Sequence, residues 1–277
     1  EDWIEYITRC QHILQTGDHV SDILSVDGEN RPFSSFPGAG DLSLGWAPGF
    51  KTDVSEIGIL DELSVDDEGF LRASYQGKLL PNRYKMLTLS NADLMRVETA
   101  RKLGKLAEQG VLVFAARPVR TPSLHNAARN DAALQQLIQK YWDSGLIRNP
   151  DGFEQALAKV QPDCALPDQM EYVHHRLDGA DFYFVSNQMY VARSEKVTFR
   201  IAGKLPELWD PETGETMPAP NWSMTPDGRT QVELDLDPAD SLFVVFREPT
   251  TKQSAEAPKW EYKAVATLDG DWTVRFD

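Results

Sequence analysis

The chain has 277 residues, with 28 Lys or Arg against 43 Asp or Glu, which gives a formal net charge of −15. Phosphate neutralisation requires clustered cations, so this acidic balance argues against a nucleic-acid partner. No run of about 18 apolar residues is present, so the sequence predicts no membrane span. The only cysteines, Cys10 and Cys164, allow at most one disulfide.

The N-terminal part predicts a helix, a strand and a long loop. Residues 2–16 carry apolar side chains at helical spacing, with Cys10 on the apolar face, and Gly17 ends the pattern. The apolar run over 20–26 predicts a buried strand. Residues 32–49 are rich in proline and glycine, but their aromatic side chains favour an ordered loop.

The next part of the chain has an α/β pattern. Residues 84–89 and 111–115 are expected to be buried strands on either side of a helix over 93–109. Strand, helix and strand in this order predict a parallel sheet. Two more helices are expected over 131–142 and 152–160. The turn after the first strand lacks a glycine-rich phosphate loop, so we expect a Rossmann-like domain, of the flavodoxin or amidotransferase kind, that binds no nucleotide.

Beyond residue 170 the hydrophobic period changes to two, which indicates β-strands. The Asp178-Gly179 pair between apolar runs predicts a tight hairpin. Further strands are predicted over 196–201, 207–209, 231–236 and 241–246. Together they predict an antiparallel sheet or small sandwich.

The C-terminal part has a different composition. Residues 249–258 resemble a linker, and the alternation of Trp272, Val274 and Phe276 predicts a strand that has just begun. A lone strand has no partner for its backbone groups. We therefore expect the chain to be a segment of a longer protein.

The densest polar cluster on a predicted strand is His174-His175-Arg176. Neighbouring strand residues face opposite sides, so the two imidazoles are not expected to chelate one metal. One of these side chains is a candidate to line a substrate cleft. The alternative is a cross-strand pair with Asp181 or a contact between domains.

Glu29 is the strongest single candidate for chemistry, because it follows a buried strand and precedes an aromatic loop. Glycosidases use carboxylates at such strand ends as acid, base or metal ligand. Asp22 and Asp27 are near enough in sequence to join Glu29 around calcium, which prefers oxygen ligands. The alternative interpretation is three solvated turn acids.

Several stretches together resemble the bacterial α-L-rhamnosidases of glycoside hydrolase family 106. The matching stretches are residues 9–29, 84–89 with the following helix, 109–113, 122–124, 175–188, 207–214, 241–247 and 270–276. The resemblance implies α/β plus all-β architecture and a division into four parts. These are 1–54 (the last helix, strand and loop of a catalytic (β/α)8 barrel), 55–168 (the Rossmann-like domain), 169–248 (the antiparallel β domain) and 249–277 (a linker and the first strand of a further β-sandwich).

The resemblance also implies a function. The parent would be a glycosidase that releases terminal rhamnose from plant or microbial polysaccharide, with calcium as a cofactor and a periplasmic or extracellular location. Its partners would be the carbohydrate and the absent N-terminal barrel and C-terminal β domains. Glu29 is carried over as a cleft or metal-side residue. The expected substrate contacts are Trp46, His174, His175 and Arg176, and the expected metal ligands are Asp22 and Asp27.

This segment alone is not expected to catalyse hydrolysis, because one barrel strand cannot place two carboxylates and exclude water. The alternative function is a non-catalytic carbohydrate-binding or structural module. Binding predicts an exposed aromatic platform, with Trp46, Trp209 and Trp222 as candidates, whereas a structural role predicts that these rings are buried.

Overall fold

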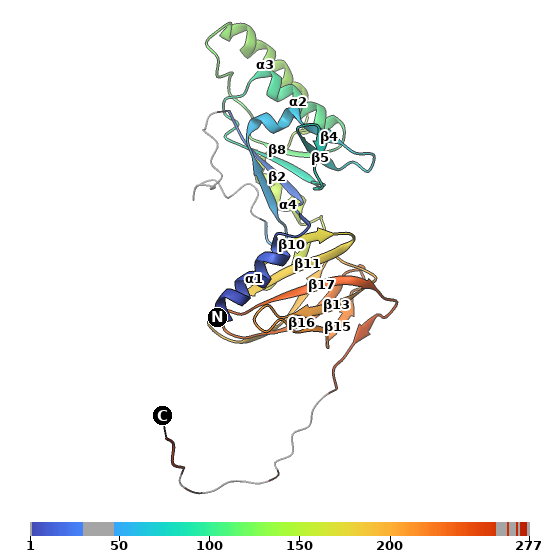
Figure 1. Ribbon diagram of the computed structural model, residues 1–277. Coiled ribbons are helices and arrows are strands. Elements are labelled where there is room, and N and C mark those ends of the chain that lie inside the picture. Colours follow the sequence, from blue (N-terminus) through green and yellow to red (C-terminus); the bar gives the residue numbers. More distant parts are fainter. Residues whose placement is uncertain (1, 30–46, 259–264, 266–269, 271, 276–277) are drawn as a thin grey trace.

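The computed structural model describes residues 2–29, 47–258, 265, 270 and 272–275. An α/β part lies above an antiparallel β-sandwich in Figure 1. The predicted combination of a parallel α/β layer with antiparallel sheets is present. In the described part of the chain, no helix is both long and apolar enough to cross a membrane.

The α/β part is built on a four-stranded parallel sheet in the order β3-β2-β7-β8. Its strands are β2 (Ile23–Asp27), β3 (Thr52–Ser55), β7 (Met86–Ser90) and β8 (Leu112–Ala115), and helix α2 (Val97–Glu108) connects β7 to β8. The predicted crossover of strand, helix and strand is therefore confirmed. All five residues of β7 are buried, as expected for a parallel strand covered on both faces.

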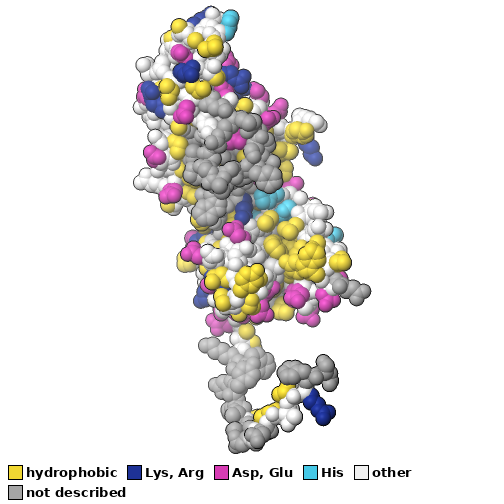
Figure 2. All heavy atoms as spheres, turned by 90° about the vertical axis from the view of Figure 1, so that its left-hand side faces the viewer, with side chains coloured by type: hydrophobic (Ala, Val, Ile, Leu, Met, Phe, Trp, Pro, Cys, Tyr) yellow, Lys and Arg dark blue, Asp and Glu magenta, His cyan; other side chains and the backbone are white. Residues whose placement is uncertain are grey.

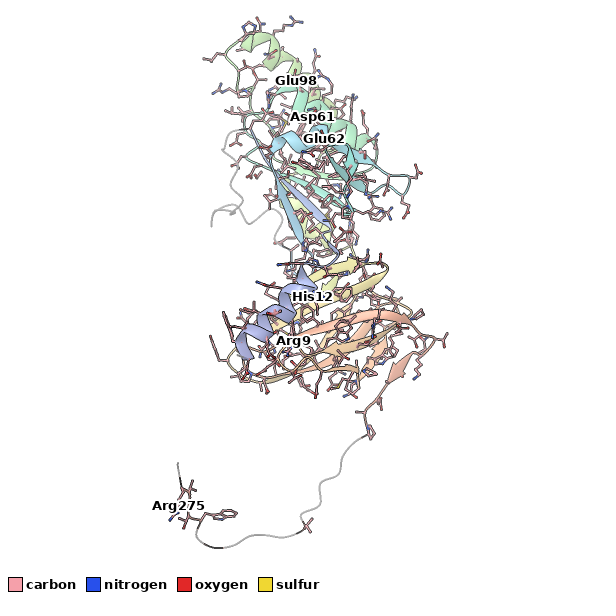
Figure 3. The ribbon with its side chains drawn as sticks, viewed as in Figure 1. Arg9, His12, Asp61, Glu62, Glu98 and Arg275 are labelled. Carbon is pink, nitrogen blue, oxygen red and sulfur yellow. The ribbon has the colours of Figure 1, made fainter. Side chains whose placement is uncertain are left out.

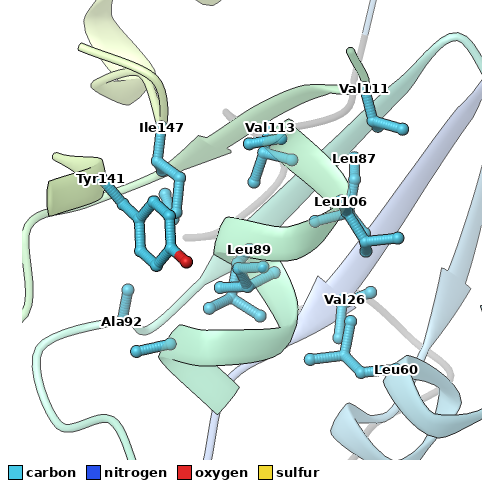
Figure 4. Packing of buried hydrophobic residues seen from close by; sticks show 14 of the residues in the cluster. Val26, Leu60, Leu87, Leu89, Ala92, Leu106, Val111, Val113, Tyr141 and Ile147 are labelled. Atoms are coloured by element: carbon cyan, nitrogen blue, oxygen red, sulfur yellow. The ribbon is translucent and has the colours of Figure 1, made fainter. Parts of the chain in front are cut away.

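Helices cover both faces of this sheet. On one face α2 and α3 (Ala127–Tyr141) pack on the apolar side chains that Figure 4 shows, among them Leu87 and Val113. On the other face Phe153, at the start of α4 (Phe153–Leu157), packs against Phe114. The remaining α/β elements are η1 (Ile57–Asp61), η2 (Pro150–Gly152) and the antiparallel strands β4 (Leu63–Val65), β5 (Leu71–Tyr75) and β6 (Lys78–Leu79).

The sandwich consists of two antiparallel sheets around a shared core. One sheet has the order β1-β10-β11-β17-β13-β14 and the other β18-β15-β16-β12-β9. The strands of the first are β1 (Asp18–His19), β10 (Met170–Leu177), β11 (Ala180–Asn187), β13 (Lys204–Trp209), β14 (Thr216–Pro218) and β17 (Ser241–Pro249). Those of the second are β9 (Cys164–Ala165), β12 (Arg193–Phe199), β15 (Trp222–Met224), β16 (Thr230–Leu236) and β18 (Ser254–Ala255).

The predicted hairpin joins β10 to β11. Asp178 has φ 48° and Gly179 has φ 80°, the two left-handed conformations of a type I′ turn. Because the turn matches the twist of the flanking strands, it sets the register that places Arg176 opposite Asp181. Three of the four further predicted strands are confirmed as parts of β13, β16 and β17, and the fourth, 196–201, corresponds to β12, which ends at Phe199.

Helix α1 (Asp2–Leu14) packs on the outer face of the six-stranded sheet, as Figures 1 and 3 show. Cys10 is buried there against Phe243, which confirms its predicted role in core packing. Arg9, labelled in Figure 3, donates hydrogen bonds to backbone carbonyls in the turn between β13 and β14. Trp3 and Ile4, at the other end of the predicted apolar face, are exposed.

The structure divides the chain differently from the expected domains at three points. The boundary after residue 54 falls inside β3, and β2 pairs with both β3 and β7, so this strand belongs to the same sheet as the α/β domain. Strand β1 pairs with β10 and α1 covers the sandwich, so the first residues are divided between the two parts. Strand β9 pairs with β12, so the sandwich begins before residue 169. Non-local pairing overrides the local pattern in each case. The closed barrel stays a prediction.

The predicted strand at the C-terminus is not formed over the described residues 272–275. Trp272 is 75% exposed and Val274 is 68% exposed, so neither packs on a sheet face. A strand requires a partner for its backbone groups, and local alternation alone does not supply one. Phe276 lies outside the described residues.

Candidate functional site

A buried histidine lies between two carboxylates in the sandwich. His174 is fully buried on β10, with Nδ1 2.9 Å from Oδ2 of Asp163 and Nε2 3.1 Å from Oδ1 of Asp181. Its ring stacks on Tyr183, with the ring centroids 3.9 Å apart. Because both ring nitrogens face acceptors, the arrangement fits an imidazolium that donates from both sides.

The charges of this cluster support each other. Burial lowers the pKa of His174, but Asp163 and Asp181 outweigh that effect and raise it above the ordinary value. Burial raises the pKa of Asp163, yet the positive charges of His174 and Arg200 hold it below its usual range. The pKa of Asp181 is also lowered, against its burial, by hydrogen bonds from His174 and Lys204. Each shift therefore favours the charged form of its group.

The cluster continues across the junction between the sandwich and the α/β part. The Arg200 guanidinium donates to both oxygens of Asp22, at 3.0 Å each, and to Oδ1 of Asp163 at 3.1 Å. Lys85 lies 3.1 Å from Oδ1 of Asp22. Positive and negative groups alternate from the start of β2 into the sandwich. In order they are Lys85, Asp22, Arg200, Asp163, His174, Asp181 and finally Arg176 with Lys204.

The polar groups at the buried centre of this network are hydrogen-bonded to one another. Both nitrogens of His174 are used, and Asp163 accepts from His174, Arg200 and Tyr183. A buried network in which each member has its partners makes the packing of its surroundings specific. The network from Lys85 to Arg176 and Lys204 therefore connects the α/β part to the sandwich, and we call it the joint.

A pocket of about 380 Å³ opens beside this joint. The α/β part contributes Lys85, Asn82 and Phe70 to its wall, and the sandwich contributes Arg176 and Arg200. The remaining lining residues are Asp18, His19, Val20, Ser21, Asp22, Pro81 and Arg83. Figure 2 shows histidine side chains at the level where the two parts meet. The pocket has a mixed polar and apolar wall, as small-molecule sites usually do.

Asp53 is not part of the pocket lining, but it accepts hydrogen bonds from residues on the polar side of the pocket. Its carboxylate accepts from Ser21 Oγ at 2.7 Å, Asn82 Nδ2 at 2.8 Å and the Tyr84 hydroxyl at 2.7 Å. His19 Nε2 lies 3.9 Å from Oδ1 of Asp53. Burial lowers the pKa of His19 despite the nearby Asp53 charge, so the ring is neutral at pH 7. The pocket therefore presents fixed polar groups to a ligand.

Glu29 lies at the carboxyl edge of the parallel sheet, away from this pocket. Its carboxylate accepts from the backbone N–H of Arg96 at 2.8 Å and from Arg96 Nε at 2.9 Å, and it also contacts the Thr99 hydroxyl. Arg96 is the residue before α2, so Glu29 caps the N-terminus of that helix. Its side chain is only 5% exposed.

The two expected metal ligands, Asp22 and Asp27, lie at opposite ends of β2. They are five residue steps apart along the extended chain, which corresponds to about 16 Å. Asp22 is paired with Arg200 and Lys85, whereas Asp27 accepts from the Ser90 hydroxyl at 2.8 Å. The two carboxylates therefore do not fit one calcium ion. The described residues also contain no group of three or more His, Cys, Asp or Glu arranged to bind a metal.

The expected substrate contacts separate into different environments. His174 is buried, and His175 faces the other side of the strand, where its ring is 5.5 Å from that of His19. Arg176 donates to Asp181 at 2.7 Å and lines the pocket, so the cross-strand alternative is confirmed for this pair. Trp46 lies outside the described residues.

The other candidate aromatic platforms do not stand free in solvent. Trp222 is buried in the sandwich core at 4% exposure, as expected for a structural role. Trp209 is half-buried on the outer face, where the Arg247 guanidinium lies 5.3 Å from its ring centroid. The structural alternative therefore accounts for these two rings.

Sequence reasoning missed four residues that build the joint and the pocket: Asp163, Arg200, Asp53 and Lys85. Arg200 and Lys85 lie inside the predicted strands 196–201 and 84–89, where they were not marked as polar site residues. Asp163 and Asp53 lie between predicted elements, so no local period marked them. A charged residue next to a buried strand is the one signal that could have indicated them, because isolated charges are rarely buried without partners.

The comparisons with known proteins agree with the resemblance. The chain is 28% identical over 262 residues to a putative β-glucuronidase of Formosa agariphila, covering 91% of this chain and 21% of that protein. Its fold is similar to the solved rhamnosidase from Novosphingobium sp. PP1Y, with a TM-score of 0.78 and 30% identity, over 97% of this chain and 26% of that one. The chain thus spans about a quarter or less of these proteins. The family model for α-L-rhamnosidases of glycoside hydrolase family 106 matches residues 1–222, and the chain belongs to that family.

Proposed function

We propose that the whole protein is an α-L-rhamnosidase that removes terminal rhamnose from plant or microbial polysaccharide, in the periplasm or outside the cell. The match of residues 1–222 to the family model carries the proposal. The fold similarity to a rhamnosidase at 30% identity supports it.

The chain on its own is expected to be inactive. An inverting glycosidase holds two carboxyl groups about 6.5–9.5 Å apart, with room for a water between them. In the described residues the most buried carboxylates, Asp163 and Asp181, are held by His174 and other cations. Neither is free to protonate or to activate water. The catalytic carboxylates are therefore expected from other parts of the protein.

Glu29 is proposed to support the substrate cleft indirectly. Ligands of parallel α/β sheets bind beyond the carboxyl ends of the strands, where Glu29 lies. Its carboxylate fixes the start of α2 through Arg96 and Thr99, so its role is to position that edge.

A structural accessory role is the second candidate. The alternating charges between Lys85 and Asp181 join the α/β part to the sandwich, and Trp222 is buried rather than offered to a sugar. Under this alternative, the segment holds neighbouring domains in place and contacts no substrate.

Hydrolysis of an aryl α-L-rhamnoside tests both candidates. The 277-residue chain is compared with the protein extended through the predicted barrel, each with calcium and with a chelator. We expect turnover only by the extended protein, reduced by Glu29→Gln. Glu108→Gln is the control, because Glu108 makes one exposed pair with Lys140 on the same α/β part. A folded extended protein with no turnover would exclude the rhamnosidase proposal.

A further inference from the structure

The pocket at the junction carries more positive than negative charge within an acidic chain. Its lining includes four Arg or Lys side chains but only two Asp. One of these, Asp22, is already neutralised by Arg200 and Lys85, and the other, Asp18, is exposed at the edge. Each of the four cations is already paired with a carboxylate of the chain, so the wall offers a ligand the N–H groups that these pairs leave unused.

Arg176 lines this pocket and has unused hydrogen-bonding capacity. Its Nε donates to Asp181 at 2.7 Å, while its two terminal nitrogens have no hydrogen-bond partner in the described part of the chain. The side chain is 53% exposed. A guanidinium held at Nε still presents two terminal N–H groups, which suit the two oxygens of a carboxylate.

Lys85 adds a second donor to the same wall. Its ammonium contacts one oxygen of Asp22 at 3.1 Å, which leaves further N–H groups for a ligand. The pKa of Lys85 is lowered, because the effect of burial outweighs the opposing effect of the Asp22 charge. An additional anion in the pocket would therefore favour the charged form of this side chain.

The pocket also has an apolar wall suited to the C–H face of a sugar ring. Phe70 and Pro81 line it, and the Arg83 guanidinium lies 4.3 Å from the Phe70 ring centroid, which fixes that wall. Asn82 and His19 line the polar side. Asn82 is held there by its hydrogen bond to Asp53, and His19 Nε2 lies 3.9 Å from the same carboxylate. Its volume of about 380 Å³ lies within the usual range for small-molecule sites.

We propose that this pocket binds a carboxylate-bearing sugar residue, a uronic acid unit of a saccharide, with its carboxylate on Arg176 and Lys85 and its ring against Phe70 and Pro81. The pocket binds the sugar without cleaving it. The proposal is independent of the rhamnosidase proposal, because it concerns affinity alone.

Calorimetric titration of the 277-residue chain with D-glucuronate at low ionic strength tests the proposal. D-glucose, which has the same ring without the carboxylate, and inorganic sulfate, which has charge without the ring, are titrated in parallel. We expect saturable binding of glucuronate, at least about tenfold tighter than that of either comparison ligand, because the carboxylate and the ring both contribute.

Arg176→Gln should weaken glucuronate binding about tenfold or more. Arg117→Gln is a matched control, because Arg117 is 52% exposed, donates through Nε to Asp143 at 3.0 Å and lies outside the pocket. Amide NMR shifts on titration provide a readout that is independent of these variants. They should be largest at His19, Asn82 and Lys85.

Three outcomes would overturn the proposal. They are equal binding of glucose and glucuronate, sulfate binding as tight as glucuronate binding, and glucuronate binding that Arg176→Gln leaves unchanged. Absence of saturable binding, or amide shifts confined to regions away from the pocket, would also exclude it.

Discussion

Arg200 holds Asp22 through two hydrogen bonds of 3.0 Å, although the two residues are 178 positions apart in the sequence. Asp22 precedes the central strand of the parallel sheet, and Arg200 follows β12 of the sandwich. The pair is largely buried, with Asp22 5% exposed and Arg200 22% exposed. It therefore links the two parts of the molecule directly.

Breaking this pair should destabilise the protein strongly. Arg200→Met leaves the buried carboxylates of Asp22 and Asp163 short of a partner, and we expect a loss of about 3 kcal/mol in the free energy of unfolding. Urea denaturation measures the change. Arg229→Met is the control, because its partner Asp227 lies within the same turn and is half exposed. Equal losses in the two variants would contradict the role of the joint.

Stability should fall as pH rises through the raised pKa of His174. A histidine whose folded pKa is raised contributes stability that is complete below its unfolded pKa of about 6.5 and is lost above the folded value. His19 and His175 have lowered pKa values, mainly through burial. The stability linked to these two residues is therefore present above the unfolded pKa of about 6.5 and is lost as pH falls through their folded values. The two effects therefore occupy different pH windows.

The free energy of unfolding of the parent chain should decline as the pH is raised from about 6 to about 9, a range that begins just below the unfolded His pKa of about 6.5. His174→Gln should remove the decline, whereas His12→Gln, at an exposed site on α1, should preserve it. If the His174 variant does not fold, NMR of the parent chain decides the question. Both ring N–H signals of His174 should persist above the pH at which an ordinary histidine loses its proton.

Gly179→Ala should destabilise the β10–β11 hairpin through the backbone alone. Gly179 has φ 80°, and an added Cβ meets no atom within 4 Å. The cost of a left-handed residue is about 1–2 kcal/mol. Gly152→Ala is the control, because Gly152 has φ −88° and equally open surroundings. If thermal unfolding shows no difference between the variants, the turn conformation is wrong.

Gly104→Ala should destabilise the α/β part, although alanine normally favours helices over glycine. A Cβ at this position would lie 2.1 Å from the Tyr141 ring where α2 packs on α3. Overpacking of this kind costs about 1–3 kcal/mol, which exceeds the helix preference of about 1 kcal/mol. A rise in the thermal midpoint would contradict the close packing of these helices.

Local patterns predicted much of the fold. The helix over 93–109, its two neighbouring strands and the Asp178-Gly179 hairpin follow from periodicity and turn chemistry, which depend on residues near each other in sequence. The pairing of β2 with β3 and β7, and of β1 with β10, was missed because these contacts join distant segments.

The candidate site was less predictable than the fold. The pairing of Arg176 with Asp181 follows from the hairpin register, so the sequence indicated it as an alternative. The positions of Asp22 and Asp27 at opposite ends of one strand were not anticipated, because closeness in sequence suggested a shared ion. Arg200 and Asp163 could be placed only once the sandwich and the sheet were packed together.

Turnover of two aryl glycosides by the extended protein tests the central claim most directly. An aryl α-L-rhamnoside and an aryl β-D-glucuronide are supplied separately, since the chain is similar to a solved rhamnosidase and to a putative β-glucuronidase. We expect hydrolysis of the rhamnoside with negligible release from the glucuronide. Hydrolysis of the glucuronide alone would contradict it.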